Sequence, residues 1–157
     1  METGITALIR HAKAGERGTH HDQLRALTEG GQRQAERLVG QLAAVRIGRV
    51  LTSPYVRCRQ TVEPLASARG LKVEDSEPLA EGGSGVVVLG LMAELAGAGA
   101  ALCSHGDVIG TVLQELVRRG LLDLSELRAS KGSTWLVEFN GSEPRRATYL
   151  AAPESNP

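Results

Sequence analysis

The sequence predicts an α/β domain, a three-layer α/β/α sandwich with a mostly parallel central sheet. Short apolar runs alternate along the chain with segments in which apolar residues recur at helical spacing, which is the order of repeated strand–helix units. Several of the short runs are apolar at nearly every position, as parallel strands buried on both faces are. With 157 residues, 41% of them hydrophobic, the chain suits one core. We expect a single domain over 1–152 and a frayed tail over 153–157.

Six runs rich in aliphatic residues predict the strands. The first stops abruptly at Arg10 and His11, and the fourth stops in the same way at His105, as buried strands do where they enter a loop. The last two are separated by the turn-forming segment 140–144, which predicts an antiparallel edge of the sheet. The expected strands cover 5–9, 49–53, 71–74, 100–104, 134–139 and 145–150.

The segments between these strands have the periodicity of helices. Thr28 is placed to cap the first helix, and Pro54 opens the second. Pro64 lies inside the second helix and is expected to kink or shorten it. The segment 77–85 ends in Gly-Gly-Ser-Gly, which predicts a mobile loop. The expected helices cover 28–45, 54–68, 86–95 and 108–117.

The composition limits the partners that we expect. Lys plus Arg and Asp plus Glu each number 18, so no overall positive field draws the chain to nucleic acid or to an anionic membrane. The N-terminus lacks the pattern of a secretory signal, and no stretch reaches the roughly 18 apolar residues that span a bilayer. Only two cysteines occur, Cys58 and Cys103, far apart in the sequence, and they are expected to be buried thiols and not a disulfide scaffold. These features predict a cytoplasmic protein.

Two histidines and two arginines are predicted to gather at one edge of the sheet. His11 follows the first strand and His105 the fourth, and ligands of open α/β sheets bind beyond the carboxyl ends of the strands. Arg10 precedes His11, and Arg57 lies near the start of a helix, whose N-terminus itself favours an anion. One guanidinium group can donate two parallel N–H hydrogen bonds to two oxygens of a phosphate. The sequence therefore predicts a site for a small anion such as phosphate.

The same residue types support transfer of a phosphoryl group. A histidine attacks phosphorus through a neutral ring nitrogen when a hydrogen bond holds its other nitrogen, and covalent transfer divides one displacement into two easier ones. The arginines would stabilise charge on the transferring group in both steps. Glu81, in the glycine-rich loop, is the candidate proton donor for a leaving alkoxide, a role typically worth about 10² to 10⁴ in rate.

Four short motifs resemble, in the same order, those of the histidine phosphatase superfamily, which also includes the cofactor-dependent phosphoglycerate mutases. The Leu-Ile-Arg-His-Ala segment over 8–12 is similar to the Arg-His-Gly or Arg-His-Ala signature of that family. The segments 27–38, 53–61 and 104–106 are similar to its following helix, its second arginine motif and its second histidine motif. The short chain is most similar to the SixA-type phosphohistidine phosphatases. It also resembles domains fused to Nudix hydrolases, through the Lys-Gly-Ser-Thr-Trp segment over 131–135.

This resemblance implies a phosphoglycerate mutase-like fold and a hydrolase, a phosphatase with a phosphohistidine intermediate. It implies that His11 is the nucleophile, that Arg10 and Arg57 bind phosphate, and that His105 is the second histidine of the pocket, acting in catalysis and in phosphate binding. Neither a metal nor an organic cofactor is expected.

The substrate is left open between a phosphohistidine protein and a small phosphoester or nucleotide. The alternative to an enzyme is a non-catalytic phosphate-binding regulatory module, which is favoured if Glu81 does not reach the site. Mutase activity is disfavoured, because Ala12 and the glycines after Glu81 depart from the larger relatives. Lys13 and Lys131 are interpreted as surface lysines, with contact to the substrate as the alternative.

Overall fold

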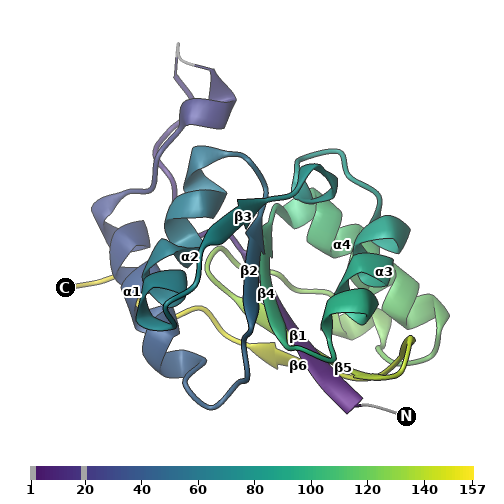
Figure 1. The fold of residues 1–157 in the computed structure, drawn as a ribbon. Helices are drawn as coiled ribbons and strands as arrows, with labels where there is room; N and C mark the ends of the chain where they lie inside the picture. Colours follow the sequence, from purple (N-terminus) through teal and green to yellow (C-terminus); the bar gives the residue numbers. More distant parts are fainter. Residues whose placement is uncertain (1–2, 19–20) are drawn as a thin grey trace.

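The computed structural model describes residues 3–18 and 21–157, which form one six-stranded sheet with helices on both faces (Figure 1). The strands are β1 (Thr3–Arg10), β2 (Arg49–Thr52), β3 (Val73–Asp75), β4 (Ala100–Ser104), β5 (Thr134–Asn140) and β6 (Glu143–Leu150). The helices are α1 (Glu29–Gln41), α2 (Val56–Ala68), α3 (Gly85–Leu95) and α4 (Gly106–Arg118). Three short 3₁₀ helices are η1 (Asp22–Leu24), η2 (Glu77–Leu79) and η3 (Leu124–Glu126).

The sheet has the strand order β3-β2-β4-β1-β5-β6. The first four of these strands pair in parallel. In contrast, β5 runs antiparallel to β1 and β6 antiparallel to β5, so the predicted antiparallel edge is confirmed. Because β1, β2 and β4 are parallel, their carboxyl ends meet at one edge of the sheet. Arg10, Thr52 and Ser104 end the strands there.

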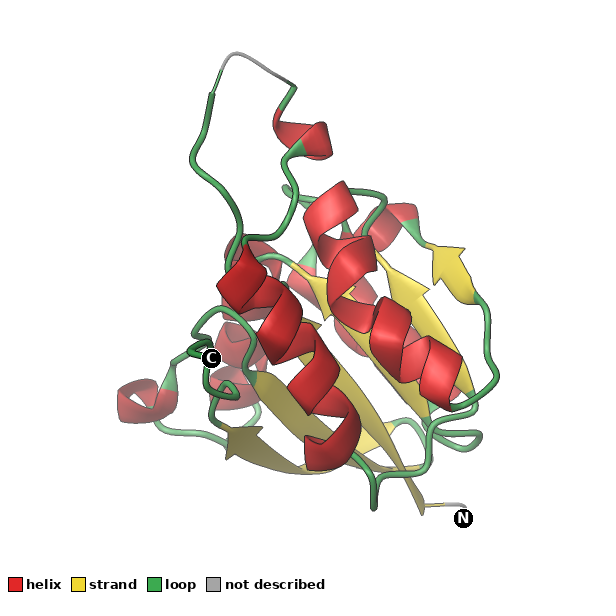
Figure 2. Cartoon of the chain, turned by 90° about the vertical axis from the view of Figure 1, so that its left-hand side faces the viewer, coloured by secondary structure: helices red, strands yellow, loops and turns green. Residues whose placement is uncertain are grey.

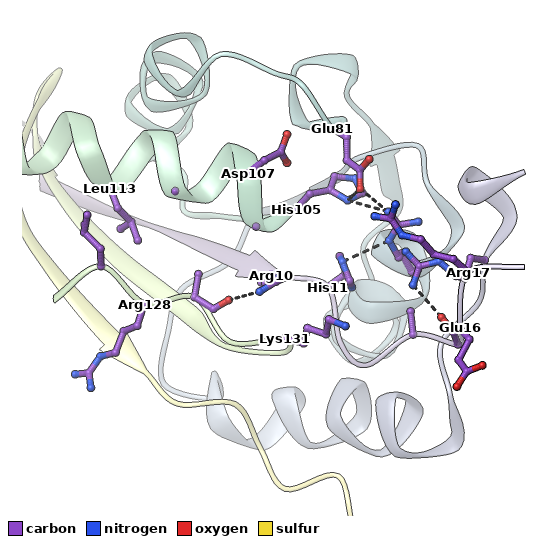
Figure 3. Close-up of a pocket in the computed structure, with 18 of the residues that line it drawn as sticks. Arg10, His11, Glu16, Arg17, Glu81, His105, Asp107, Leu113, Arg128 and Lys131 are labelled. Carbon is purple, nitrogen blue, oxygen red and sulfur yellow. Dashed lines mark hydrogen bonds and ion pairs between the residues drawn. The ribbon is translucent and has the colours of Figure 1, made fainter. Parts of the chain in front are cut away.

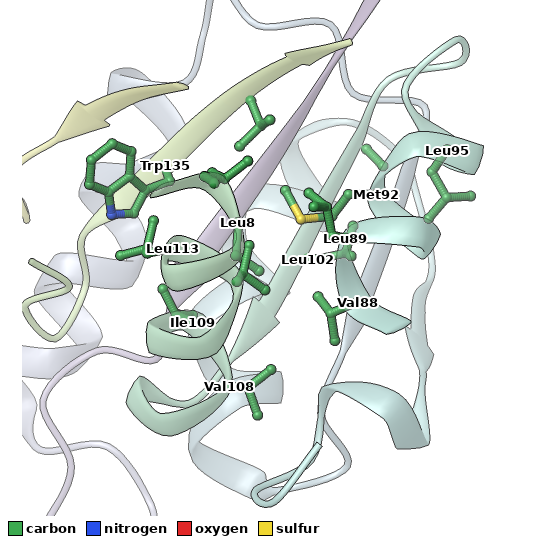
Figure 4. Close-up of a cluster of buried hydrophobic side chains, with 14 of the residues drawn as sticks. Leu8, Val88, Leu89, Met92, Leu95, Leu102, Val108, Ile109, Leu113 and Trp135 are labelled. Atoms are coloured by element: carbon green, nitrogen blue, oxygen red, sulfur yellow. The ribbon is translucent and has the colours of Figure 1, made fainter. Parts of the chain in front are cut away.

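Alternate residues of the central strands face opposite layers of helices. In β1, Leu8 belongs to the cluster beneath α3 and α4, whereas Ala7 and Ile9 belong to the cluster beneath α1 and α2. Figure 2 looks onto α1 and α2 with the sheet behind them, and Figure 4 shows the opposite cluster, in which Leu102 lies among side chains of α3 and α4. Because both faces are covered, the central strands are mostly apolar. The predicted three-layer sandwich is confirmed.

Two of the helices, α1 and α3, begin at residues whose side chains cap them. The side chain of Thr28 accepts a hydrogen bond from the backbone nitrogen of Gly31, and α1 starts at Glu29, directly after Thr28. The side chain of Ser84 caps α3 in the same way. Pro64 does not shorten α2, which continues to Ala68 as a single helix. Tertiary packing accounts for this, because the buried face of α2 lies against the sheet and outweighs the loss of one backbone hydrogen bond.

The tail over 153–157, for which the sequence predicts fraying, lies against α1. Its backbone carbonyls accept hydrogen bonds from polar side chains of that helix. Gln34 donates to Pro153 at 3.1 Å, and Arg33 donates to Ser155 at 2.7 Å. In these contacts side chains of α1 take the place of water as partners of the tail's backbone.

Two expectations from composition concern burial and membranes. Cys58 and Cys103 are free and buried, as predicted. Over residues 3–18 and 21–157, no helix combines the length and the hydropathy that a membrane span requires.

Candidate active site

The residues predicted to bind an anion meet in one pocket at the carboxyl edge of the parallel strands (Figure 3). Arg10 ends β1 and His11 follows it, while His105 follows β4 and immediately precedes α4. Arg57 lies in the first turn of α2. The pocket has a volume of about 930 Å³. The topology of the sheet therefore brings together residues that are far apart in the chain: Arg10 and His105 are separated by 95 positions.

His11 is held with one defined nitrogen directed at the pocket. Its side chain is 4% exposed, and Nδ1 lies 2.8 Å from the carbonyl oxygen of Ala12. A carbonyl oxygen only accepts hydrogen bonds, so Nδ1 carries the proton and Nε2 keeps its lone pair. Burial lowers the pKa of His11 to about 3, and the positive charges of Arg57 and Arg10 act in the same direction. His11 is therefore neutral near pH 7.

His105 directs Nδ1 toward the pocket, whereas His11 directs Nε2 toward it. Nε2 lies 2.8 Å from Oγ of Ser53, and Nδ1 lies 3.4 Å from Nη2 of Arg57. Nδ1 also lies 3.5 Å from Oε1 of Glu81, so this nitrogen faces the charged groups of the pocket while Nε2 is tied to Ser53. The ring of Tyr55 packs edge-on against His105, with the centroids 4.6 Å apart. Ser53 and Tyr55, to which the sequence assigns no separate role, thus orient this histidine.

Arg57 connects both histidines with two carboxylates. The side chain is fully buried, and Nε lies 3.4 Å from Nε2 of His11. Nη2 lies 3.0 Å from the carboxylate of Asp22 and 2.7 Å from that of Glu81. A buried guanidinium is costly unless its donors are paired, so these carboxylates stabilise Arg57 between the histidines. The sequence pattern does not single out Asp22, because it lies in a loop of mostly polar residues.

Arg10 is positioned by a close approach to Gly106. Its Nη1 donates to the carbonyl oxygen of Ala129 at 2.7 Å, whereas its buried Nε has no partner among the described residues. A Cβ atom at position 106 would lie 2.9 Å from Cζ of Arg10. The guanidinium can therefore occupy this place only because residue 106 is glycine.

Glu81 reaches the site from the loop between η2 and α3. Its Oε1 lies 2.7 Å from Nη2 of Arg57 and 3.5 Å from Nδ1 of His105. The adjacent backbone is held by Asp107, whose carboxylate accepts a hydrogen bond from the nitrogen of Gly82 at 2.8 Å. The structure thus brings all five predicted site residues into one pocket.

The loop after His11 is held by residues that do not line the pocket. The side chain of Gln34 accepts a hydrogen bond from the backbone nitrogen of Lys13 at 3.0 Å. The hydroxyl of Thr61 accepts one from the nitrogen of Ala12 at 2.9 Å. These two side chains belong to segments that resemble family motifs, and their contacts tie the loop to α1 and α2.

The two lysines that the sequence places at the surface occupy different environments. Lys13 donates to the hydroxyl of Ser155 at 2.8 Å and does not line the pocket. Lys131 lines the pocket and points toward His11 (Figure 3). Burial and the surrounding arginines lower the pKa of Lys131. Only the structure distinguishes the two, because Lys131 reaches the site from the loop before β5.

A comparison with family models identifies the family. Residues 6–96, more than half of the chain, match the model of the histidine phosphatase superfamily (branch 1). The chain belongs to the histidine phosphatase superfamily. The match ends before β4 and does not include His105. In this histidine phosphatase the structure itself shows that His105 lies beside His11, with the ring centroids of the two residues 5.5 Å apart.

Known relatives cover nearly all of this histidine phosphatase. The 8-oxo-(d)GTP phosphatase of Mycolicibacterium smegmatis is 29% identical over 98% of the chain, which spans 50% of that relative's length. The putative phosphohistidine phosphatase SixA from Agrobacterium tumefaciens has a TM-score of 0.77 at 22% identity, covering 94% of this chain and 97% of its own. A phosphoserine phosphatase variant from Entamoeba histolytica has a TM-score of 0.70 at 15% identity, covering 96% and 97%. The predicted family and the phosphoglycerate mutase-like fold are confirmed.

Proposed function

We propose that this histidine phosphatase hydrolyses a phosphorylated small molecule through a covalent phosphohistidine on His11. The tautomer of His11 carries the proposal, because Nδ1 donates to Ala12 and leaves the lone pair of Nε2 for attack. In the first step Nε2 forms a bond to phosphorus while the bond from phosphorus to the leaving oxygen breaks. In the second step water attacks phosphorus, the N–P bond breaks, and inorganic phosphate leaves.

Arg10, Arg57 and His105 would bind the oxygens of the transferring group. Arg57 already contacts both histidines, so a phosphate bound there lies within reach of all three side chains. The positive charge of the two arginines and the hydrogen bonds from these side chains would stabilise the transition state without a metal or an organic cofactor. Once phosphate oxygens replace Glu81 on Arg57, the released carboxyl group is the candidate proton donor to the leaving oxygen.

Two observations support a small molecule as the substrate. The pocket volume of about 930 Å³ lies within the range of about 300–1,000 Å³ that is usual for small-molecule sites. The M. smegmatis relative, similar along almost the whole chain, is named a nucleotide phosphatase. A phosphohistidine protein is the second substrate class to test, because several structural neighbours are named phosphohistidine phosphatases. A cytoplasmic location and the absence of a nucleic-acid partner stay predictions from the sequence.

Capture of the phosphoenzyme tests this function. The protein is incubated in EDTA with radiolabelled phosphometabolites, nucleotides or phosphohistidine peptides and is quenched in base, in which phosphohistidine survives. Wild type should carry the label and His11→Ala should not. His21→Ala, at an exposed histidine, is the matched control and should label like wild type.

Equal labelling of wild type and His11→Ala would overturn the mechanism. A wild type that binds phosphate, yet neither labels nor turns over any of these substrates, would identify the non-catalytic binding module instead. Label from phosphohistidine peptides alone would overturn the choice of a small molecule.

A further inference from the structure

The pocket contains more positive charge than one phosphate group requires. Arg10 and Arg57 together match the charge of a single phosphoryl dianion. Six cationic side chains line the pocket, against three carboxylates. The cationic residues are Arg10, Arg17, Arg25, Arg57, Arg128 and Lys131, and the carboxylates are Glu16, Glu81 and Asp107. An excess of this kind indicates a ligand with additional negative charge.

Several of these cations already have partners within the chain. Arg25 pairs with Asp22 at 3.0 Å, and the guanidinium of Arg128 lies over the ring of Tyr149, 4.6 Å from its centroid. The ammonium group of Lys131 makes no ion pair or hydrogen bond within residues 3–18 and 21–157. Of the acidic residues, Glu16 directs its carboxylate away from His11 (Figure 3). Lys131 is therefore a cation of the pocket that an anionic ligand can pair.

Lys131 lies on a turn that is fixed to the site. The backbone nitrogen of Gly132 donates to the carbonyl oxygens of Arg10 and His11, at 3.1 and 3.0 Å. The side chain of Gln34 donates to the carbonyl oxygen of Lys131 at 3.3 Å. Gly132 has a φ of +87°, a left-handed conformation that favours glycine. The turn that carries Lys131 is thus built against the nucleophile.

The surroundings of Lys131 favour the binding of an anion. Burial, and then the charges of Arg10, Arg25 and Arg57, lower its pKa, because each disfavours another positive charge at this place. A bound anion relieves the repulsion by neutralising several of these charges together. The phosphate against His11 already has Arg10, Arg57 and His105 as donors, so the group paired with Lys131 is a different one.

We propose that Lys131 binds the inner phosphate of an organic diphosphate whose terminal phosphate is transferred to His11. This inference rests on the proposed function and names its substrate class. Nε2 of His11 bonds to the terminal phosphorus, and the bond from that phosphorus to the bridging oxygen breaks. The organic monophosphate leaves with the bridging oxygen, and water then releases inorganic phosphate from His11. A phosphate leaving group is a stable anion and needs less proton donation than an alkoxide.

The organic part of the substrate has a place along α4. Beyond Arg10 the pocket continues past Gly110 and Leu113 of α4 and Leu127 of the loop after η3. A Cβ atom added at Gly110 would meet nothing within 4 Å, so this part of the pocket is open. Its mixture of apolar and polar side chains suits an organic group larger than a single phosphate.

Binding of two non-hydrolysable anions tests the second site. Methylenediphosphonate carries two anionic groups and methylphosphonate carries one, and their P–C bonds resist hydrolysis. Affinities are measured by calorimetry in EDTA. Wild type should bind the diphosphonate at least tenfold more tightly. Lys131→Met should lose roughly tenfold in diphosphonate affinity, as expected for one charge-assisted hydrogen bond, and less than roughly threefold in methylphosphonate affinity.

Two further variants control for charge and for folding. Lys131→Arg keeps a cation and should retain most of the diphosphonate affinity. Lys13→Met removes a neighbouring lysine that does not line the pocket and should leave both affinities unchanged. Equal loss of both affinities in Lys131→Met would place Lys131 on the transferred phosphate and overturn the proposal, and no loss would overturn it as well.

These measurements are independent of catalysis. If His11 forms no phosphoenzyme but the affinity for the diphosphonate still depends on Lys131, the proposed function fails and the second anion site stands.

Gly110→Leu tests the placement of the organic part of the substrate. This substitution should raise KM for an organic diphosphate severalfold while the affinity for the diphosphonate stays constant. Gly40→Leu, at a helix position that is equally open, is its control. An unchanged KM in Gly110→Leu would overturn the placement of the organic group.

Discussion

His11 should make this histidine phosphatase less stable as the pH falls from 7 to 5. In the folded state burial lowers the pKa of His11 to about 3, against an ordinary value of 6.5. Between these two values the unfolded chain binds a proton at His11 and the folded chain does not. Protons therefore stabilise the unfolded state. The contribution of His11 to stability is fully present above pH 6.5 and is lost progressively as the pH falls toward 3.

The size of this effect follows from the same two pKa values. Within the window, each pH unit changes the free energy of unfolding by about 1.4 kcal/mol for one proton. From pH 6.5 to pH 5, His11 alone should therefore remove about 2 kcal/mol. That is a large share of the roughly 5–15 kcal/mol by which single domains are stable.

Urea unfolding of wild type and His11→Asn at pH 7, 6 and 5 measures the effect. Asparagine does not titrate, and its amide N–H can replace Nδ1 as the donor to Ala12. The free energy of unfolding of wild type, relative to that of His11→Asn, should fall by about 2 kcal/mol over this range. His21→Asn removes an exposed histidine and should keep the pH dependence of wild type. The NMR signal of His11 is identified as the histidine signal that is absent in His11→Asn. Its chemical shift should stay constant from pH 7 to pH 5.

Equal pH dependence of wild type and His11→Asn would refute the reasoning. So would an NMR titration of His11 with a midpoint near 6.5, because a proton on Nε2 at that pH removes the lone pair on which the nucleophile depends.

Three substitutions test the remaining geometry. Gly106→Ala should raise KM for phosphorylated substrates roughly tenfold in steady-state kinetics, because the new Cβ displaces Arg10, the proposed phosphate ligand; an unchanged KM would show that Arg10 does not bind phosphate. Glu81→Gln should lower kcat on alkyl phosphoesters about 100-fold but spare phosphohistidine peptides, whose leaving group needs less help. Equal losses on both substrates would contradict that role. Leu102→Ala, at a fully buried position of β4, should cost about 3 kcal/mol in urea unfolding, and a loss below about 1 kcal/mol would contradict the packing.

The elements that local pattern controls are those that the sequence predicts well. The strand expected over 100–104 is β4, Ala100–Ser104, because a short, mostly apolar run is buried on both faces. The helix expected after Thr28 begins there, because the hydroxyl of Thr28 caps it. The tail over 153–157 is different. Its polar composition predicts fraying, and no local pattern predicts the hydrogen bonds that it receives from α1, far away in the chain.

By itself, the sequence determined the fold class, the placement of His11 and His105 where strands end, and that of Arg57 near the start of a helix, because periodicity and element ends are local properties. Only the tertiary structure decided which nitrogen of His11 faces the pocket, and that Asp22 and Glu81 pair with Arg57. Those contacts depend on strand order and on single hydrogen bonds between distant loops, which no local pattern encodes. For the same reason only the structure separated Lys131, which lines the pocket with His11, from Lys13, which binds the C-terminal tail.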